Sequence, residues 1–112
     1  MKRDSMEVLV YKALKYLYRC MRKGVEPNDD FMAHDGELFG EVPYPYWAAI
    51  WCELVDMGLV RGVKRLDSVE GTTIAFSNPR ITFAGKEFLN NNSTMHKAAK
   101  FVNAVRPGVS IG

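Results

Sequence analysis

The sequence predicts one domain of the α+β class, and three observations lead to this class. Apolar residues recur with a helical period over residues 6–23 and again over residues 46–57. Two runs with the character of strands, 59–66 and 73–76, are separated by turn-forming residues. The length of 112 residues, with 47% hydrophobic and 25% charged side chains, is typical of a single globular domain with one modest core.

The first predicted helix covers residues 6–23, with Asp4 or Ser5 as its N-cap and Gly24 as its C-terminal stop. Its apolar residues share one helical face, and its basic residues fall on the opposite face, flanked by Tyr11 and Tyr18. Such a basic stripe is either the solvated side of an amphipathic helix or a surface that binds phosphates. The apolar residues are Val10, Ala13, Leu14, Leu17 and Met21, and the basic residues are Lys12, Lys15, Arg19, Arg22 and Lys23.

The next predicted helix follows an acidic segment. Residues 25–41 are broken by proline and glycine, and we expect at most one short helix there, near residues 29–34. The two prolines within residues 42–45 predict an extended approach to the helix at 46–57. That helix ends before Gly58 and has four predicted core residues, Trp47, Ile50, Trp51 and Leu54.

The predicted strands 59–66 and 73–76 pair as a hairpin across a turn at 67–72, and residues 77–80 form a break. A helix then begins after Thr82 as its N-cap and continues to residue 91, with apolar contacts from Phe83, Phe88 and Leu89. A last helix covers residues 93–105. We therefore expect a single domain over residues 1–106, with its core in 6–89, and a flexible tail at 107–112.

This order of elements is that of a winged helix-turn-helix domain with a two- or three-stranded antiparallel wing and a C-terminal helical extension. Residues 78–89, NPRITFAGKEFL, resemble the step that follows the wing in many winged-helix proteins. Together with the residues that follow the other predicted helices (24–28, 58–62 and 91–97), this segment is similar to the YjcQ family of small bacterial and phage-borne proteins. The resemblance covers roughly residues 6–105. It implies a winged-helix fold, a bacterial or prophage origin and no assigned catalytic residue.

The net charge of +2 conceals an uneven distribution of charge. Residues 24–60 contain eight acidic residues and no Lys or Arg, whereas the rest of the chain contains all 15 Lys and Arg with five acidic residues. The two parts therefore carry −8 and +10. Since surface potential follows local clusters, this segregation predicts separate acidic and basic surfaces.

The first functional hypothesis is a regulator that binds double-stranded DNA. The exposed positions of the helix at 46–57 include Glu53 and Asp56 and no basic residue, which disfavours docking of this helix in the major groove. Contact is therefore predicted through the first helix and the wing. The predicted nucleic-acid-binding residues are Lys12, Lys15, Arg19, Arg22, Arg61, Lys64, Arg65 and Arg80.

The alternative hypothesis is a protein-interaction module that forms a homodimer or binds another protein through an aromatic and acidic surface. Its predicted partner-binding residues are Tyr44 and Tyr46, because tyrosine is enriched at interface hot spots. Two measurements distinguish the hypotheses. A DNA-binding protein should bind DNA with an affinity that falls steeply as salt rises, whereas a self-associating protein should show the mass of a dimer in solution.

Catalysis is not expected. The chain has no phosphate-binding loop and no pair of metal ligands at the spacing of a zinc site, and we expect no cofactor and no small-molecule substrate. Cys20 and Cys52 predict two buried free thiols in a reducing cytoplasm. No apolar run is long enough for a transmembrane helix and no signal peptide is recognisable, so a cytoplasmic location without a membrane partner is expected.

Overall fold

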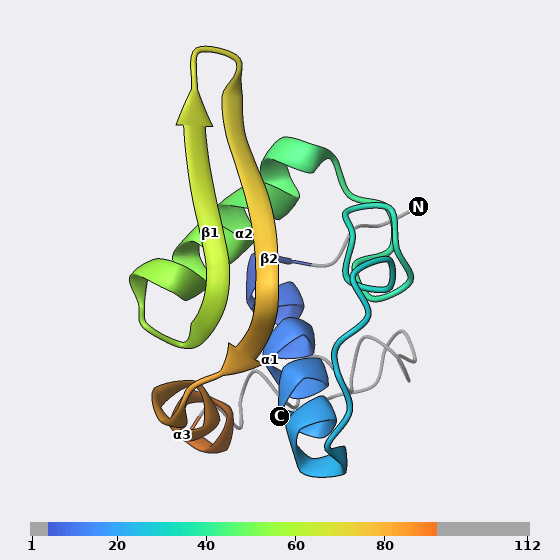
Figure 1. Ribbon diagram of the computed structural model, residues 1–112, viewed down its shortest axis with the longest axis vertical. Helices are drawn as coiled ribbons and strands as arrows, with labels where there is room; N and C mark the ends of the chain where they lie inside the picture. Colours follow the sequence, from blue (N-terminus) through green and yellow to red (C-terminus); the bar gives the residue numbers. More distant parts are fainter. Residues whose placement is uncertain (1–4, 92–112) are drawn as a thin grey trace, which may run out of the picture.

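The structure is a computed structural model, and it describes residues 5–91. Within these residues the fold is α+β, with three helices and one two-stranded antiparallel sheet, as predicted for the class. Figure 1 shows the strands on one side of the molecule, with α2 and α1 behind them and the hairpin tip projecting beyond the helices. The elements are α1 (Met6–Lys23), α2 (Tyr44–Asp56), β1 (Val60–Ser68), β2 (Gly71–Ile81) and α3 (Phe83–Asn91). The predicted helix at 93–105 and the tail lie outside the described residues.

Helix α1 has the predicted bounds because local signals define both of its ends. The Ser5 hydroxyl accepts a hydrogen bond from the amide of Val8 at 3.3 Å, and Gly24 ends the helix in the left-handed conformation with a φ of 69°. Four of the five predicted apolar residues are buried. Met21 is 48% exposed, contrary to the prediction, because Cys20 and not Met21 turns toward the core in the last turn.

The segment between α1 and α2 contains turns and bends, so the short helix expected near residues 29–34 is absent. Three residues of this segment, Met32, Phe39 and Val42, are nevertheless buried in the core. The indole N–H of Trp47 donates to the carbonyl oxygen of Met32 at 2.8 Å, and this bond ties the segment to α2. The apolar anchors and this buried hydrogen bond position the segment without regular secondary structure.

Helix α2 begins at Tyr44, two residues earlier than predicted. Pro45 lies inside its first turn, where a missing N–H costs no helical hydrogen bond. The four predicted core residues of this helix are buried. The ring of Phe76 on β2 lies 5.9 Å from that of Trp47 and 5.1 Å from that of Trp51, so the aromatic side chains join α2 to the sheet.

The hairpin is longer than predicted, and its turn consists of residues 69–70 only. Residues 77–80 are part of β2 and not a break between elements. The register shifts between Arg61 and Val63, and both Gly62 on β1 and Asn78 on β2 have positive φ angles of 79° and 57°. This irregularity is a β-bulge, which bends the ladder without ending it.

Helix α3 starts after Thr82, as predicted. The Thr82 hydroxyl accepts a hydrogen bond from the amide of Gly85 at 3.0 Å and donates one to the carbonyl of Gly58 at 2.7 Å. Phe88 and Leu89 are half-buried against the core. Phe83 is 72% exposed, so its predicted apolar contact is wrong. It is the first residue of the helix, whereas the two residues that reach the core lie in the later turns.

Candidate functional site

The two faces of the sheet have different environments. Val63 and Phe76 are partners across the strands and face the helices, where Phe76 contacts the tryptophans of α2. Their neighbours along the strands, Lys64 and Ala75, are partners on the opposite face, because successive side chains alternate. We call this solvent-exposed side of the sheet the outer face.

The bulge at Gly62 brings two cations to the outer face. Arg61 and Lys64 are three residues apart, and in a regular strand such residues point to opposite faces. The bulge changes this alternation, since Val60 and Val63 are both buried toward the helices. Arg61 and Lys64 are consequently both exposed on the outer face, which illustrates how a bulge re-aims side chains.

A third cation completes this group. Arg80 on β2 is the direct cross-strand partner of Arg61 and is also exposed. Within the described residues, no ion pair involves Arg61, Lys64 or Arg80. Like charges directly opposite each other destabilise a sheet, so folding alone does not favour this pair. We call Arg61, Lys64 and Arg80 the basic sheet face.

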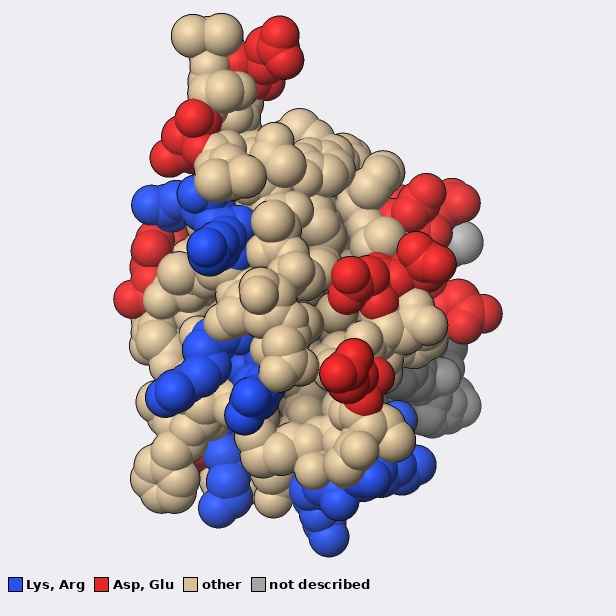
Figure 2. Space-filling view, in the orientation of Figure 1, with Lys and Arg blue, Asp and Glu red and all other residues tan. Residues whose placement is uncertain are grey.

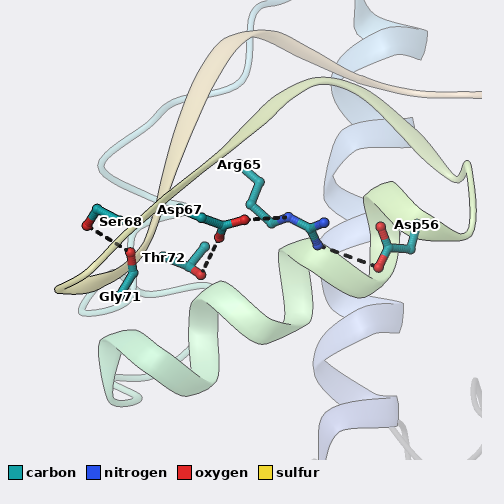
Figure 3. Close-up of polar contacts among 6 residues, drawn as sticks. All are labelled: Asp56, Arg65, Asp67, Ser68, Gly71 and Thr72. Atoms are coloured by element: carbon teal, nitrogen blue, oxygen red, sulfur yellow. Dashed lines mark hydrogen bonds and ion pairs between the residues drawn. The ribbon is translucent and has the colours of Figure 1, made fainter.

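Arg65, a fourth predicted contact, points to the other side of the hairpin. Its guanidinium lies 3.6 Å from the Asp56 carboxylate on α2 and 3.8 Å from that of Asp67 on β1 (Figure 3). The Cys52 side chain and the carboxylate of Asp56 raise the pKa of Arg65 above its ordinary value. Thr72 also donates a hydrogen bond to Asp67 at 2.8 Å. Arg65 thus connects the hairpin to α2 and is separate from the basic sheet face.

The predicted basic residues of α1 differ in their surroundings. Lys12 is half-buried, and the ammonium of Lys15 donates a hydrogen bond to the Tyr11 hydroxyl at 3.5 Å. Toward the end of the helix the cations are exposed, and the guanidinium carbon of Arg22 lies 5.9 Å from the centre of the Tyr18 ring. The exposed cations of the last turns, which we call the α1 basic end, are Arg19, Arg22 and Lys23.

Positive and negative charges are partly separated on the visible surface. Figure 2 shows Lys and Arg side chains over the two strands and again at the lower end of the molecule, where α1 ends in Figure 1. Asp and Glu side chains lie at the hairpin tip and on the right, where Figure 1 places the segment between α1 and α2, and also along the left edge next to the cations over the strands. The segregation of charge along the sequence is therefore only partly retained on this surface.

The exposed side of α2 repels anions. Its exposed residues include Glu53 and Asp56. A depression of about 560 Å³ between α2 and the hairpin is lined by these two residues, by Glu70 and by the paired Arg65. Carboxylates outnumber cations here, so phosphate groups are disfavoured beside α2.

The two predicted partner-binding tyrosines have contacts within the chain. The Tyr44 hydroxyl accepts a hydrogen bond from the amide of Ile74 at 3.0 Å, and its ring centre lies 5.0 Å from that of Trp47. Tyr46 is half-buried against the core. Tyr44 therefore attaches the start of α2 to β2. Partner binding through either residue stays a prediction.

Other candidate chemistry is sparse in the described part of the chain. Cys20 is buried as predicted, Cys52 is half-buried, and both are free thiols. Residues 5–91 contain no cluster of three His, Cys, Asp or Glu side chains that could hold a metal ion. None of the helices formed by these residues has the length and apolar character needed to cross a membrane.

Comparison with known proteins adds one finding. A model of the family described as YjcQ protein matches residues 11–107, a range that includes the sheet, α2, α3 and most of α1. No curated protein and no solved structure matches the chain.

Proposed function

The chain belongs to the YjcQ family, and from this premise we propose that it is a non-enzymatic, winged-helix regulator that binds nucleic acid. Phosphate groups would contact the basic sheet face, and the α1 basic end would provide further contacts. Affinity for nucleic acid depends largely on Lys and Arg side chains that neutralise phosphates.

The observation that carries this proposal is the direct opposition of Arg61 and Arg80 on the outer face. Lys64 lies on the same face, and no carboxylate pairs with any of the three within the described residues. An anion bound between Arg61 and Arg80 would convert their repulsion into two favourable charge-assisted hydrogen bonds.

The α1 basic end supports contact over a longer ligand. Figure 2 shows cations over the strands and at the lower end of the molecule from one viewing direction. A nucleic-acid backbone is an extended anion and could contact both groups, whereas a small anion could not.

The proposed docking differs from that of a standard helix-turn-helix protein. In a winged helix, β1 and β2 would be the wing and α2 the second helix of the motif. Glu53 and Asp56 on the exposed side of α2 disfavour its entry into a groove. We therefore propose contact through the wing, with the pairing of Arg65 and Asp56 holding the wing against α2.

The test is a titration of a labelled duplex and a labelled single strand, followed by fluorescence anisotropy at several salt concentrations. We expect the affinity to fall steeply with salt. Replacing Arg61, Lys64 and Arg80 by Gln should weaken binding, and each lost contact should lower the salt slope by about 0.9 for duplex DNA or about 0.7 for a single strand.

Arg65→Gln is the matched control, because it removes one positive charge from the same hairpin on the opposite face. It should affect binding much less than Arg61→Gln, which removes the same charge. Equal effects of the two single variants would show that only net charge matters, and the proposed interface would be wrong.

A further inference from the structure

An exposed aromatic side chain follows the basic sheet face along the chain, at the start of α3. Phe83 is 72% exposed although it belongs to a helix whose later residues pack on the core. The ammonium of Lys86 lies 5.4 Å from the centre of the Phe83 ring. In the sequence, Arg80 precedes Phe83 by three residues. Phe83 thus has a cation near its ring and another nearby along the chain.

The backbone around Phe83 is firmly held. Ile81 is buried and pairs with Val60, so β2 ends against the core. Thr82 follows with its two hydrogen bonds, to Gly58 and Gly85. Three residues span at most about 11 Å, so the ring is attached within that distance of the Arg80 backbone. The fold therefore keeps the backbone of Phe83 close to that of Arg80.

An accessible aromatic ring next to cations is the arrangement with which proteins bind unpaired nucleotides. The base stacks on the ring, and the cations contact the backbone phosphates. Val69 at the hairpin tip is also fully exposed, but it has no aromatic face. In an undistorted duplex the faces of the bases are covered by their neighbours, so stacking on an aromatic side chain favours a base that is unpaired.

We propose that Phe83 is a stacking platform for an unpaired base, and that the ligand of the basic sheet face is therefore single-stranded nucleic acid. This inference rests on the proposed function and specifies its ligand. The cations provide affinity that depends on salt, and the ring provides a preference for single strands over duplexes.

The experiment measures the affinity of the full chain for an oligothymidine strand and for a duplex, with Phe83→Leu and Phe83→Trp compared with the parent protein. Stacking energies predict that Phe83→Leu weakens single-strand binding by about 5- to 150-fold, and that Phe83→Trp retains it. Duplex binding should be weaker and unaffected by either change. Val69→Ala is the control for loss of an exposed apolar side chain, and circular dichroism verifies that each variant is folded.

Each result gives a distinct answer. If Phe83→Leu binds the single strand as tightly as the parent while Arg61→Gln still weakens it, the stacking role is wrong and the proposed interface survives. If Phe83→Leu weakens only duplex binding, the ring is a wedge between paired bases, which also overturns the inference. If neither nucleic acid binds, the proposed function itself fails.

Discussion

Arg61 and Arg80 face each other across β1 and β2 on the exposed side of the sheet. Like charges at directly opposed positions are expected to lower the stability of the free protein, and such repulsion is screened as ionic strength rises. A sequence under selection for stability alone would place opposite charges or neutral side chains at these two positions. We therefore expect the pair to carry a cost in folding stability.

Replacing one member of the pair should stabilise the free protein. We expect Arg80→Gln to raise the free energy of unfolding by about 0.2–1 kcal/mol at low salt, because like charges directly opposite destabilise a sheet. Urea denaturation at low and high salt measures the change, which should shrink as salt screens the repulsion. Lys64→Gln is the control, since its partner is Ala75. An equal gain from Lys64→Gln would show that the effect comes from net charge.

The bulge should require glycine at position 62. A Cβ on Gly62 would lie 2.6 Å from the carbonyl oxygens of Ser77 and Asn78, and φ is +79°. Gly58 has a similar φ of +71° with open space around it. We expect Gly58→Ala to cost about 1–2 kcal/mol for its left-handed backbone. Gly62→Ala should cost clearly more, because it adds a steric clash.

The two glycine variants are compared by thermal and urea denaturation. The nucleic-acid affinity of Gly62→Ala should also fall where the protein is folded, because Arg61 and Lys64 would lose their shared face. Equal destabilisation by the two variants would contradict the close approach of the strands at the bulge.

The two buried tryptophans should differ in their sensitivity to loss of the indole N–H. Trp47 donates to Met32, whereas among the described residues the N–H of Trp51 has no partner. Both changes to Phe create a cavity, but only Trp47→Phe leaves a buried carbonyl unsatisfied. We expect Trp47→Phe to cost about 1–3 kcal/mol more than Trp51→Phe.

Chemical denaturation of both variants measures this difference, and amide exchange locates it. Trp47→Phe should accelerate exchange in residues 25–43, which that hydrogen bond anchors to α2. The same stability loss in both variants would mean that the bond to Met32 contributes little.

Stability should fall at high pH because of Tyr16. Burial raises the pKa of Tyr16 above its ordinary 10.0, against a smaller lowering by the hydrogen bond from the Asn28 amide. The unfolded chain therefore releases this proton at a lower pH than the folded chain. The contribution of Tyr16 to the free energy of unfolding is fully present below pH 10. It is lost as the pH rises through the pKa that Tyr16 has in the folded protein.

The measurement is the free energy of unfolding across this alkaline range for the parent and for Tyr16→Phe. The variant should show a smaller loss of stability with rising pH. Identical slopes for the two proteins would contradict the raised pKa.

The ends of α1 and the buried stripe of α2 were predictable because they depend on residues close together in the sequence. Ser5 and Gly24 define α1 by local hydrogen bonds and backbone conformation, and the spacing of Trp47 and Trp51 indicates their shared buried face. The acidic segment before α2 was visible in composition, but its three core residues were not. Their burial depends on contacts with distant elements.

The candidate site was predictable in part. The basic residues of the hairpin were identified from sequence, but their division between two faces was not. Gly62 lies between Arg61 and Val63, and an isolated glycine in a strand is the available signal for a bulge. For Phe83, the pattern following Thr82 correctly predicted a helix but wrongly predicted an apolar contact, because which side of α3 is covered depends on packing against distant elements.

The sequence by itself determined the class of fold, the limits of α1, the core stripe of α2 and the separation of acidic from basic segments, since composition, periodicity and capping act over a few residues. Tertiary structure alone decided that Arg61, Lys64 and Arg80 share one face, that Arg65 turns to Asp56, and that Phe83 is exposed. These outcomes depend on strand register and on packing between elements far apart in the chain, and a one-residue change in register reverses the face of every side chain beyond it.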